Sequence, residues 1–175
     1  MGQQDLLLPW LSVIDNVTLG RRLRAEDPKG SEAQSRAKQL LDAVGLTGYE
    51  HSLPATLSGG MRQRAALART LMENRPVVLM DEPFSAIDAI TRLRLQELAA
   101  DLLRDRTVLL VTHDPLEALR LGDRIHVLSG RPVVISDAVL PTGPRPRPAG
   151  DPDLLTNQAK LLGQLSAAME DTAAA

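Results

Sequence analysis

The sequence predicts an α/β fold with parallel core strands, a small helical subdomain and a C-terminal hairpin plus helix. Two short apolar runs, residues 77–80 and 107–112, have the length of buried parallel strands, and a segment with helical periodicity separates them. Two further helical segments precede the first strand. The hydrophobic share of 43% is almost entirely aliphatic, because aromatic residues make up only 2% of the 175 residues. Such a composition suits an α/β domain.

The first helix is predicted over residues 31–44. Alanine, leucine and valine side chains recur on one helical face, and Gly45 follows as a stop signal. Ser31 and Gln34 have the spacing of a capping box, in which each side chain bonds the backbone near the other. We therefore expect an amphipathic helix that begins with its own cap.

The second helix is predicted from Gly59 to about Glu73. Ser58 precedes it as the N-cap, apolar residues follow with helical spacing, and Pro76 closes it. Three basic residues of this helix are expected to face solvent: Arg62, Arg64 and Arg69.

The remaining elements follow the first strand in order. A helix over residues 88–103 leads into the second strand. Asp114 as N-cap and Pro115 at the first helical position then start a short helix that ends near Gly122. Three more features complete the prediction: a hairpin formed by residues 124–128 and 132–135, an extended Pro-rich segment over 141–152, and a last helix near 153–165.

Composition and charge exclude several classes of protein. The 20 Lys and Arg residues against 22 Asp and Glu leave no basic excess, which argues against a nucleic-acid binder. The absence of cysteine excludes disulfides and thiolate metal sites, and it fits a reducing compartment. No apolar run approaches the roughly 20 residues that span a bilayer, and no signal peptide pattern is present. We therefore expect a cytoplasmic setting.

Acidic residues follow the first predicted strand, at the edge where parallel sheets place their ligands. Asp81 and Glu82 end the apolar run 77–80, and His113 follows the second strand in the same way. One carboxylate can hold Mg²⁺ while its neighbour takes a proton from an attacking water. The alternative is that Asp-Glu-Pro only begins a turn.

A second candidate site is the start of the helix at Gly59. Ser58, Gly59 and Gly60 offer exposed backbone N–H groups, a hydroxyl and the positive end of a helix dipole, which together attract anions. Taken alone, these residues favour a simple helix cap over an anion site, because Gly-rich helix starts are common as caps.

Five motifs follow one another in a fixed order: Gln3 with Leu8-Pro9-Trp10, residues 57–63 (LSGGMRQ), 77–83 (VVLMDEP), 85–88 (SAID) and 111–114 (VTHD). In sequence and spacing they resemble the nucleotide-binding subunit of ATP-binding cassette (ABC) transporters. The resemblance covers residues 3 to about 135 and implies a partial P-loop NTPase fold. Segment 4–10 and the Pro-Arg-Pro-Arg-Pro tail resemble importers of the nitrate, sulfonate, taurine or hydroxymethylpyrimidine group.

The resemblance implies a role for each motif. Glu82 would be the general base, His113 the switch histidine, and Asp81 a ligand of Mg²⁺. Gln3 would be the Q-loop glutamine that touches Mg²⁺ and senses the membrane subunit, with Gln4 as the alternative register. ATP would be bound by the signature residues and the D-loop residue: Ser58, Gly59, Gly60, Gln63 and Asp88.

The implied partners are a second ATPase subunit in a head-to-tail dimer, a membrane permease and, indirectly, a solute-binding protein. The chain would work at the inner face of the cell membrane, with no nucleic-acid partner. The permease would contact the Q-loop and the helical subdomain, in a groove lined by Trp10, Leu11 and Val13. Ordinary packing of Trp10 is the alternative.

One family motif is missing, because the sequence contains no Gly-x-x-x-x-Gly-Lys-[Ser/Thr] P-loop (Walker A). That loop cradles the β- and γ-phosphates, so we expect a truncated chain that is inactive alone. We also expect the missing region to supply a strand between the two predicted strands. Residues 1–140 would form the truncated ATPase domain, with the helical subdomain at about 4–75 and the Walker B to switch region at 76–136. Residues 141–175 would be a Pro-rich extension with a short helix.

Two other functions compete with the importer ATPase. The first is a non-hydrolysing module that donates its signature to a complete partner ATPase, and Asp81 and Glu82 argue against it. The second is a DNA-repair or chromosome-maintenance ATPase. The interval from Gln3 to Leu57 is too short for a coiled-coil arm, and the lack of cysteine and of basic excess also disfavours this class.

Overall fold

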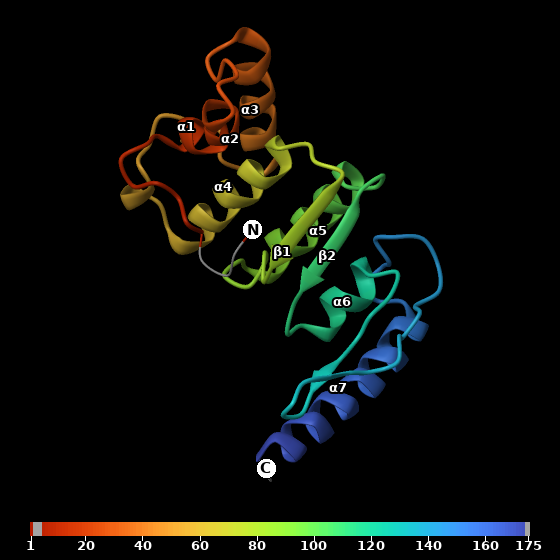
Figure 1. The fold of residues 1–175 in the computed structure, drawn as a ribbon. Coiled ribbons are helices and arrows are strands. Elements are labelled where there is room, and N and C mark those ends of the chain that lie inside the picture. Colours follow the sequence, from red (N-terminus) through yellow and green to blue (C-terminus); the bar gives the residue numbers. More distant parts are fainter. Residues whose placement is uncertain (2–4, 174–175) are drawn as a thin grey trace. The chain divides into compact units, whose positions relative to one another are not determined.

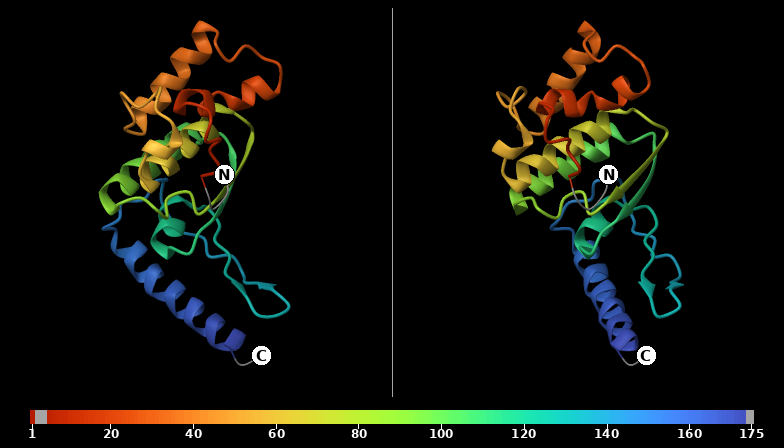
Figure 2. Two further views of the ribbon diagram at one scale, coloured as in Figure 1. Left: turned by 90° about the vertical axis from the view of Figure 1, so that its left-hand side faces the viewer. Right: turned by 60° about the vertical axis from the view of Figure 1, so that its left-hand side comes forward.

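The computed structural model describes Met1 and residues 5–173, and it divides into two compact units, Met1–Val111 and Thr112–Ala175. Figures 1 and 2 show the elements in chain order. The first unit contains a group of helices followed by a strand pair, and the second contains two helices and a small hairpin.

The helical part of the first unit is built around α4. Its elements are α1 (Val13–Val17), α2 (Leu19–Leu23), α3 (Ser31–Ala43), a 3₁₀ turn (Pro54–Thr56) and α4 (Gly59–Met72). Helices α1 and α3 both pack against α4. Ala65, Ala66 and Ala68 are fully buried on α4, and these small side chains allow the neighbouring helices to approach closely.

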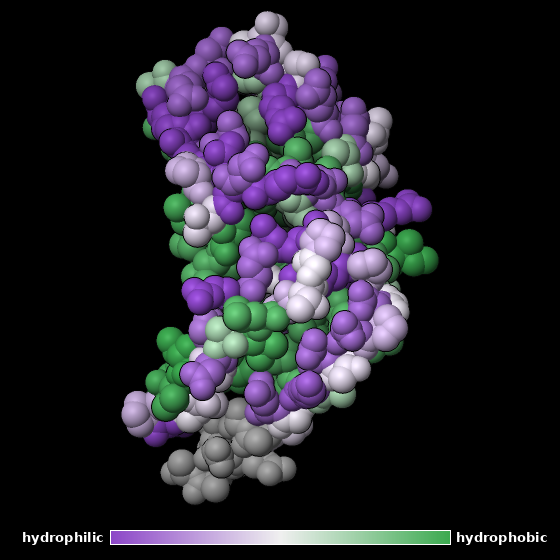
Figure 3. All heavy atoms as spheres, turned by 90° about the vertical axis from the view of Figure 1, so that its right-hand side faces the viewer, coloured by the Kyte–Doolittle hydropathy of each residue, from purple (hydrophilic) through white to green (hydrophobic). Residues whose placement is uncertain are grey.

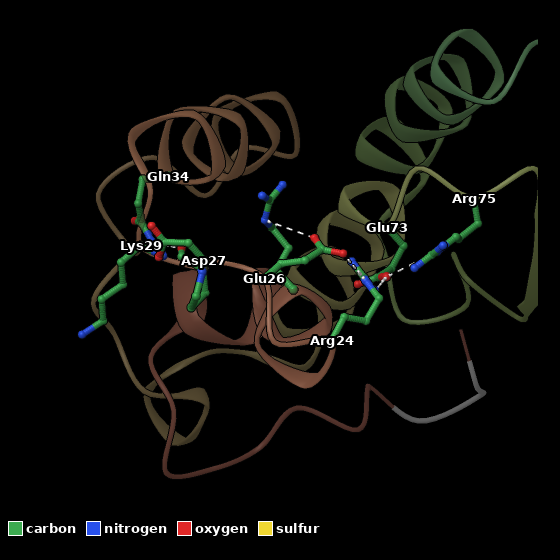
Figure 4. A network of polar contacts seen from close by, with 9 residues as sticks. Arg24, Glu26, Asp27, Lys29, Gln34, Glu73 and Arg75 are labelled. Carbon is green, nitrogen blue, oxygen red and sulfur yellow. Dashed lines mark hydrogen bonds and ion pairs between the residues drawn. The ribbon is translucent and has the colours of Figure 1, made fainter.

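Helix α3 confirms the predicted position but not the predicted cap. Its N-cap is Gly30, so Ser31 is the first helical residue, and no side chain caps the helix start. The Gln34 amide instead donates to the Pro28 carbonyl at 2.8 Å. The capping-box prediction is wrong because residues 26–30 form a bent connection that lies within reach of Gln34 (Figure 4).

The two strands pair directly and in parallel. Strands β1 (Val77–Asp81) and β2 (Thr107–Val111) run in register, with Leu79 opposite Leu109, and α5 (Ala89–Leu102) connects them. The prediction that a missing strand separates them is therefore wrong. Met1 lies beside β1, where its amine donates to the Leu79 carbonyl and its carbonyl accepts from the Asp81 N–H at 2.9 Å. This exchange is the pattern of a parallel bridge.

The strand pair is buried on one face only. Val78 and Met80 are 7% and 4% exposed, whereas the alternate residues Val77 and Leu79 are more than half exposed. On β2, Leu109 and Val111 also lie open. The expectation of fully buried strands is wrong for this face. Figure 3 shows mainly hydrophilic side chains over the helical part at the top of the view and hydrophobic ones open to the surface below it.

The second unit contains α6 (Pro115–Leu121), the short antiparallel pair β3 (Leu128–Ser129) and β4 (Val134–Ile135), and α7 (Pro152–Ala173). The predicted short helix is confirmed, and a hairpin forms where one was predicted, but its strands are shorter than residues 124–128 and 132–135. Helix α7 is longer than expected. The core of this unit joins α6, the hairpin and α7 through four buried side chains: Leu119, Val127, Leu154 and Leu161. Among the described residues, no helix combines the length and the apolar character that crossing a membrane requires.

Candidate functional site

The acidic pair lies where β1 ends. Asp81 is the last residue of the strand and its side chain is exposed. Glu82 has a φ of 46°, in the left-handed region that side-chain-bearing residues rarely adopt. Its N–H donates to the Val111 carbonyl at the end of β2, at 2.9 Å. The two strand ends therefore fix the turn that carries both carboxylates, and unusual backbone of this kind gathers at functional sites.

Gln63 of α4 holds this turn by side-chain hydrogen bonds. Its side-chain nitrogen donates to the Glu82 carbonyl at 2.8 Å and to the Ser85 hydroxyl at 3.2 Å, and its oxygen accepts from the Ala86 N–H at 2.7 Å. The Gln63 side chain is buried, at 6% exposure. Both ends of the amide are thus committed to the turn that follows β1, so Gln63 ties α4 to the acidic pair.

The start of α4 lies next to the same turn. The Ser58 hydroxyl accepts from the Met61 N–H at 3.2 Å and caps the helix. A side chain at Gly60 would bring its Cβ within 3.0 Å of the Ala86 carbonyl oxygen, so only glycine fits there without movement. Ser58 and Gly59 are exposed. The start of this 14-residue helix therefore lies open beside the acidic turn. Free N–H groups at a helix start can bind an anion, and that role stays a prediction here.

Asp88 caps the next helix. Its carboxylate accepts from the Thr91 N–H at 3.0 Å at the start of α5. Hydrogen bonds from Thr91, first from its backbone and then from its side chain, hold the pKa of Asp88 below the usual range for aspartate. Asp88 is exposed. In this chain the residue therefore acts as an N-cap, and its role across a dimer stays a prediction.

Two arginines of α4 fasten the segment that follows the predicted Q-loop. Arg62 Nε lies 2.9 Å from the carboxylate of Asp5, and Arg69 donates to the backbone carbonyls of Asp5 and Leu6 at 2.7 and 2.9 Å. Arg64 also turns inward, to the carbonyl of Val44. The expectation that these three arginines face solvent is wrong for their guanidinium groups, because a carboxylate and carbonyls of the adjacent loops accept hydrogen bonds from them; the side chains are half-buried.

Asn16 fixes the other end of this segment. The side chain is fully buried, accepts from the Leu8 N–H at 2.7 Å and donates to the carbonyls of Leu8, Leu11 and Ser12. The segment from residue 5 to residue 12 is therefore held at both ends within the first unit.

Trp10 is 71% exposed and does not pack into the core of this chain, whereas Val13 is fully buried and cannot line a surface groove. The contact of Trp10 with a permease stays a prediction. Gln3 and Gln4 lie outside the described residues. His113 belongs to the second unit, where it is exposed and directly precedes Asp114, the N-cap of α6. Its approach to Glu82 stays a prediction.

A magnesium site would rest on Asp81. Within the described residues, no group of three or more His, Asp or Glu side chains is placed to hold a metal ion. Magnesium bound with ATP needs only one or two protein carboxylates, since water and phosphate oxygens complete its shell. The exposed carboxylate of Asp81 at the end of β1 fits that requirement.

Sequence reasoning missed how Gln63 and Asn16 act. Gln63 lies in the row of buried positions that α4 turns inward, together with Ala66, Leu67 and Leu71. Asn16 follows three residues after Val13 on the buried face of α1. A polar residue on an otherwise apolar helical face is a detectable signal of a buried hydrogen-bonding role.

The comparisons with known proteins agree. Residues 1–85 match the family described as ABC transporter. A protein of Haemophilus influenzae named an uncharacterized ABC transporter ATP-binding protein is 48% identical over 168 residues, which cover 94% of this chain and 69% of that protein. The aliphatic sulfonates import ATP-binding protein SsuB 2 of Burkholderia lata is 51% identical over 162 residues, which cover 91% of this chain and 57% of that protein.

The solved structures agree with the sequence comparisons. A dimeric ATP-binding cassette in a post-hydrolysis state, bound to ADP and Pi, matches with a TM-score of 0.64 and 35% identity. The match covers 71% of this chain and 55% of that chain. The predicted α/β fold of P-loop NTPase type is thereby confirmed. The chain spans 57% of the Burkholderia relative and 55% of the cassette.

Proposed function

Because this chain belongs to the family of ABC transporter ATP-binding proteins, we propose that it forms part of the ATP-hydrolysing subunit of an importer. The relatives named for aliphatic sulfonate import support a small anionic solute, such as an alkyl sulfonate, as the cargo. The subunit would work as a dimer beside a membrane permease, at the inner face of the membrane.

The observation that carries this proposal is the link between α4 and the acidic turn. Gln63 of α4, one turn after the exposed start of that helix, bonds the backbone of Glu82 and Ala86 within one unit. In a head-to-tail dimer the start of α4 would meet the phosphate of an ATP held by the partner, and Glu82 would face the water at the other ATP. Gln63 would then connect the parts of this chain that serve the two ATP sites. A helix cap alone would not require this connection.

The roles of the residues follow from their positions. Asp81 would hold Mg²⁺, and Glu82 would take the proton of the attacking water. Ser58, Gly59 and Gly60 would bind the γ-phosphate of an ATP held by the partner subunit, and Gln63 would position the Glu82 turn. Magnesium would neutralise phosphate charge when bound. Gln3, or Gln4 in the alternative register, and His113 would complete the site, with Asp88 at the dimer contact.

The exposed Trp10 supports a contact with the permease. An exposed tryptophan is a frequent anchor of protein interfaces, and its segment is held by Asn16 and by Arg62 through Asp5. A change at Trp10 is therefore expected to weaken the permease contact without disturbing the fold. In the Trp10→Asp variant, less permease should co-purify with the chain, and unchanged co-purification would remove Trp10 from the interface.

The test of hydrolysis is ATP turnover in this chain with a Walker A segment from a relative grafted ahead of Met1. We expect Mg²⁺-dependent release of phosphate that Glu82→Gln reduces by about 100-fold or more, the usual contribution of a general base. Glu32→Gln, at an exposed position of α3, is the matched control and should leave turnover unchanged.

Equal turnover by the grafted chain and its Glu82→Gln variant would refute the role of Glu82. The alternative, a non-hydrolysing module, predicts a different result. It predicts no turnover by the grafted chain alone, together with Ser58-dependent stimulation of a complete partner ATPase.

A further inference from the structure

The Pro-Arg-Pro-Arg-Pro segment contains two arginines with opposite environments. Arg147 is buried, with 5% of its surface exposed. Arg145 lies at the surface, where its guanidinium meets the carboxylate of Asp123 at 2.9 Å and both side chains remain partly exposed. An exposed pair of this kind contributes little to stability. The two arginines therefore offer a matched comparison within one short motif.

The hydrogen bonds that the buried guanidinium donates all go to backbone carbonyls. Arg147 Nε donates to Thr142 at 2.7 Å, and Nη2 donates to Pro141 at 2.9 Å. Nη1 donates to Leu119 at 2.8 Å and to Gly122 at 2.9 Å. One side chain thus joins the Pro-rich segment to the last turn of α6 and to its C-cap.

The chemistry of a helix end explains why an arginine occupies this position. The last carbonyls of α6 have no partner within the helix and carry partial negative charge. A guanidinium is planar and presents five donors in a fixed arrangement, so it can serve several carbonyls at once. Burial lowers the pKa of Arg147, and the nearby carboxylate of Asp123 acts in the opposite direction. Arginine stays charged in proteins, so these hydrogen bonds are charge-assisted.

A reciprocal pair of hydrogen bonds between Arg147 and Arg120 stabilises the same junction. The Arg147 N–H donates to the Arg120 carbonyl at 3.0 Å, and Arg120 Nε donates back to the Arg147 carbonyl at 2.9 Å. Arg120 is itself buried on α6. The C-terminal half of α6 is therefore fixed to the Pro-rich segment from several directions.

His113 directly precedes Asp114, the N-cap at the other end of α6. Asp114 caps the helix by accepting from the N–H groups of Leu116 and Glu117, and its own N–H donates to the Thr112 hydroxyl at 3.0 Å. A helix of seven residues is about 10 Å long, at 1.5 Å per residue, and moves as one body. Fixing its C-terminal end therefore also fixes the direction in which the His113 segment leaves its N-terminal end.

We propose that Arg147 is a positioning residue that clamps the C-terminal segment to α6 and thereby orients the segment that carries His113. The link to the switch histidine rests on the proposed function, whereas the clamp on α6 does not. Of the two arginines in the motif, Arg147 forms the clamp and Arg145 does not take part in it.

Hydrogen exchange of the 175-residue chain tests the clamp. Arg147→Lys keeps the charge and most of the side-chain length, but its single ammonium group cannot donate to all four carbonyls at once. We expect the amides of α6 to exchange about 10-fold faster or more in this variant and in Arg147→Ala, as the loss of charged hydrogen bonds to a helix end implies. Arg145→Ala is the control and should exchange as the unmodified chain does.

Imidazole NMR signals separate positioning from general loosening. In Arg147→Lys the His113 signal should shift or broaden, while those of His126 in the hairpin and His51 in the first unit stay unchanged. An α6 exchange rate equal to that of the unmodified chain would overturn the clamp. A shift of both His113 and His126, or loss of helical circular dichroism in Arg147→Lys, would show a general stability role instead. These measurements involve no ATP, so failure of the proposed hydrolysis would leave them interpretable.

Discussion

Replacing Gln63 by leucine is the sharpest test of how the acidic turn is held. Leucine is close to glutamine in size, so the change removes three hydrogen bonds without opening a large cavity. The Glu82 carbonyl and the Ala86 N–H would lose their partner on Gln63, whose side chain is buried. At about 1 kcal/mol for each bond, with a further cost for partners that stay buried, the free energy of unfolding should fall by about 2–4 kcal/mol.

The loss should be concentrated at the turn. In the unmodified chain the Ala86 N–H donates to Gln63, so its exchange with solvent should accelerate by about 30- to 700-fold, which is 2–4 kcal/mol expressed as a ratio. Urea unfolding followed by circular dichroism gives the global value, and hydrogen exchange gives the local one. Gln39→Leu, at an exposed position of α3, is the control for the same substitution.

Two results would refute this reasoning. A global loss below about 0.5 kcal/mol is what surface substitutions produce, and it would mean that the three bonds contribute nothing net. Unchanged exchange at Ala86 would mean that the turn holds its left-handed backbone at Glu82 without α4. Either result would remove the connection on which the proposed function rests.

Two further predictions concern the caps and the buried amide. Asn16→Leu should lower the free energy of unfolding by about 2–4 kcal/mol, because it leaves the Leu8 N–H without its acceptor; a urea midpoint like that of Gln39→Leu would contradict this. The lowered pKa of Asp88 means that its stabilising effect is complete above the ordinary aspartate pKa of about 3.9 and is lost as the pH falls through the lower folded value. In Asp88→Asn the amide cannot titrate, so the melting temperature should change less between neutral and acid pH than in the unmodified chain. The same fall of the melting temperature at acid pH in both chains would disprove the link between the Asp88 pKa and stability.

The sequence predicts the order of the elements well because its local signals are strong. Ser58, Asp88 and Asp114 each cap the helix that follows, as their side-chain chemistry requires. The lack of a Gly-x-x-x-x-Gly-Lys-[Ser/Thr] motif in this sequence can also be established directly, by inspection of neighbouring residues. These features depend on neighbouring residues, which a single sequence displays directly.

The errors come from contacts between distant segments. Nothing local shows that Val77 and Leu79 lie open while Val78 is covered, since a continuous apolar run carries no sign of which face is packed. The direct pairing of β1 with β2 depends on how α5 crosses between them. The cap of α3 likewise changes because Gln34 finds the Pro28 carbonyl, six residues earlier.

The inward-turned arginines follow from the composition of the chain. With aromatic residues at only 2%, few large rings are present to hold loops in place by packing. Loop backbone that is partly buried still needs donors for its carbonyls. Arg64 serves Val44, Arg69 serves Asp5, and Arg147 serves the end of α6, in each case a carbonyl far away in sequence. A lysine at such a position offers three donors at one point and cannot span several carbonyls. Arginine-to-lysine changes should therefore be more damaging at these three positions than at Arg145, whose partner is a single exposed carboxylate.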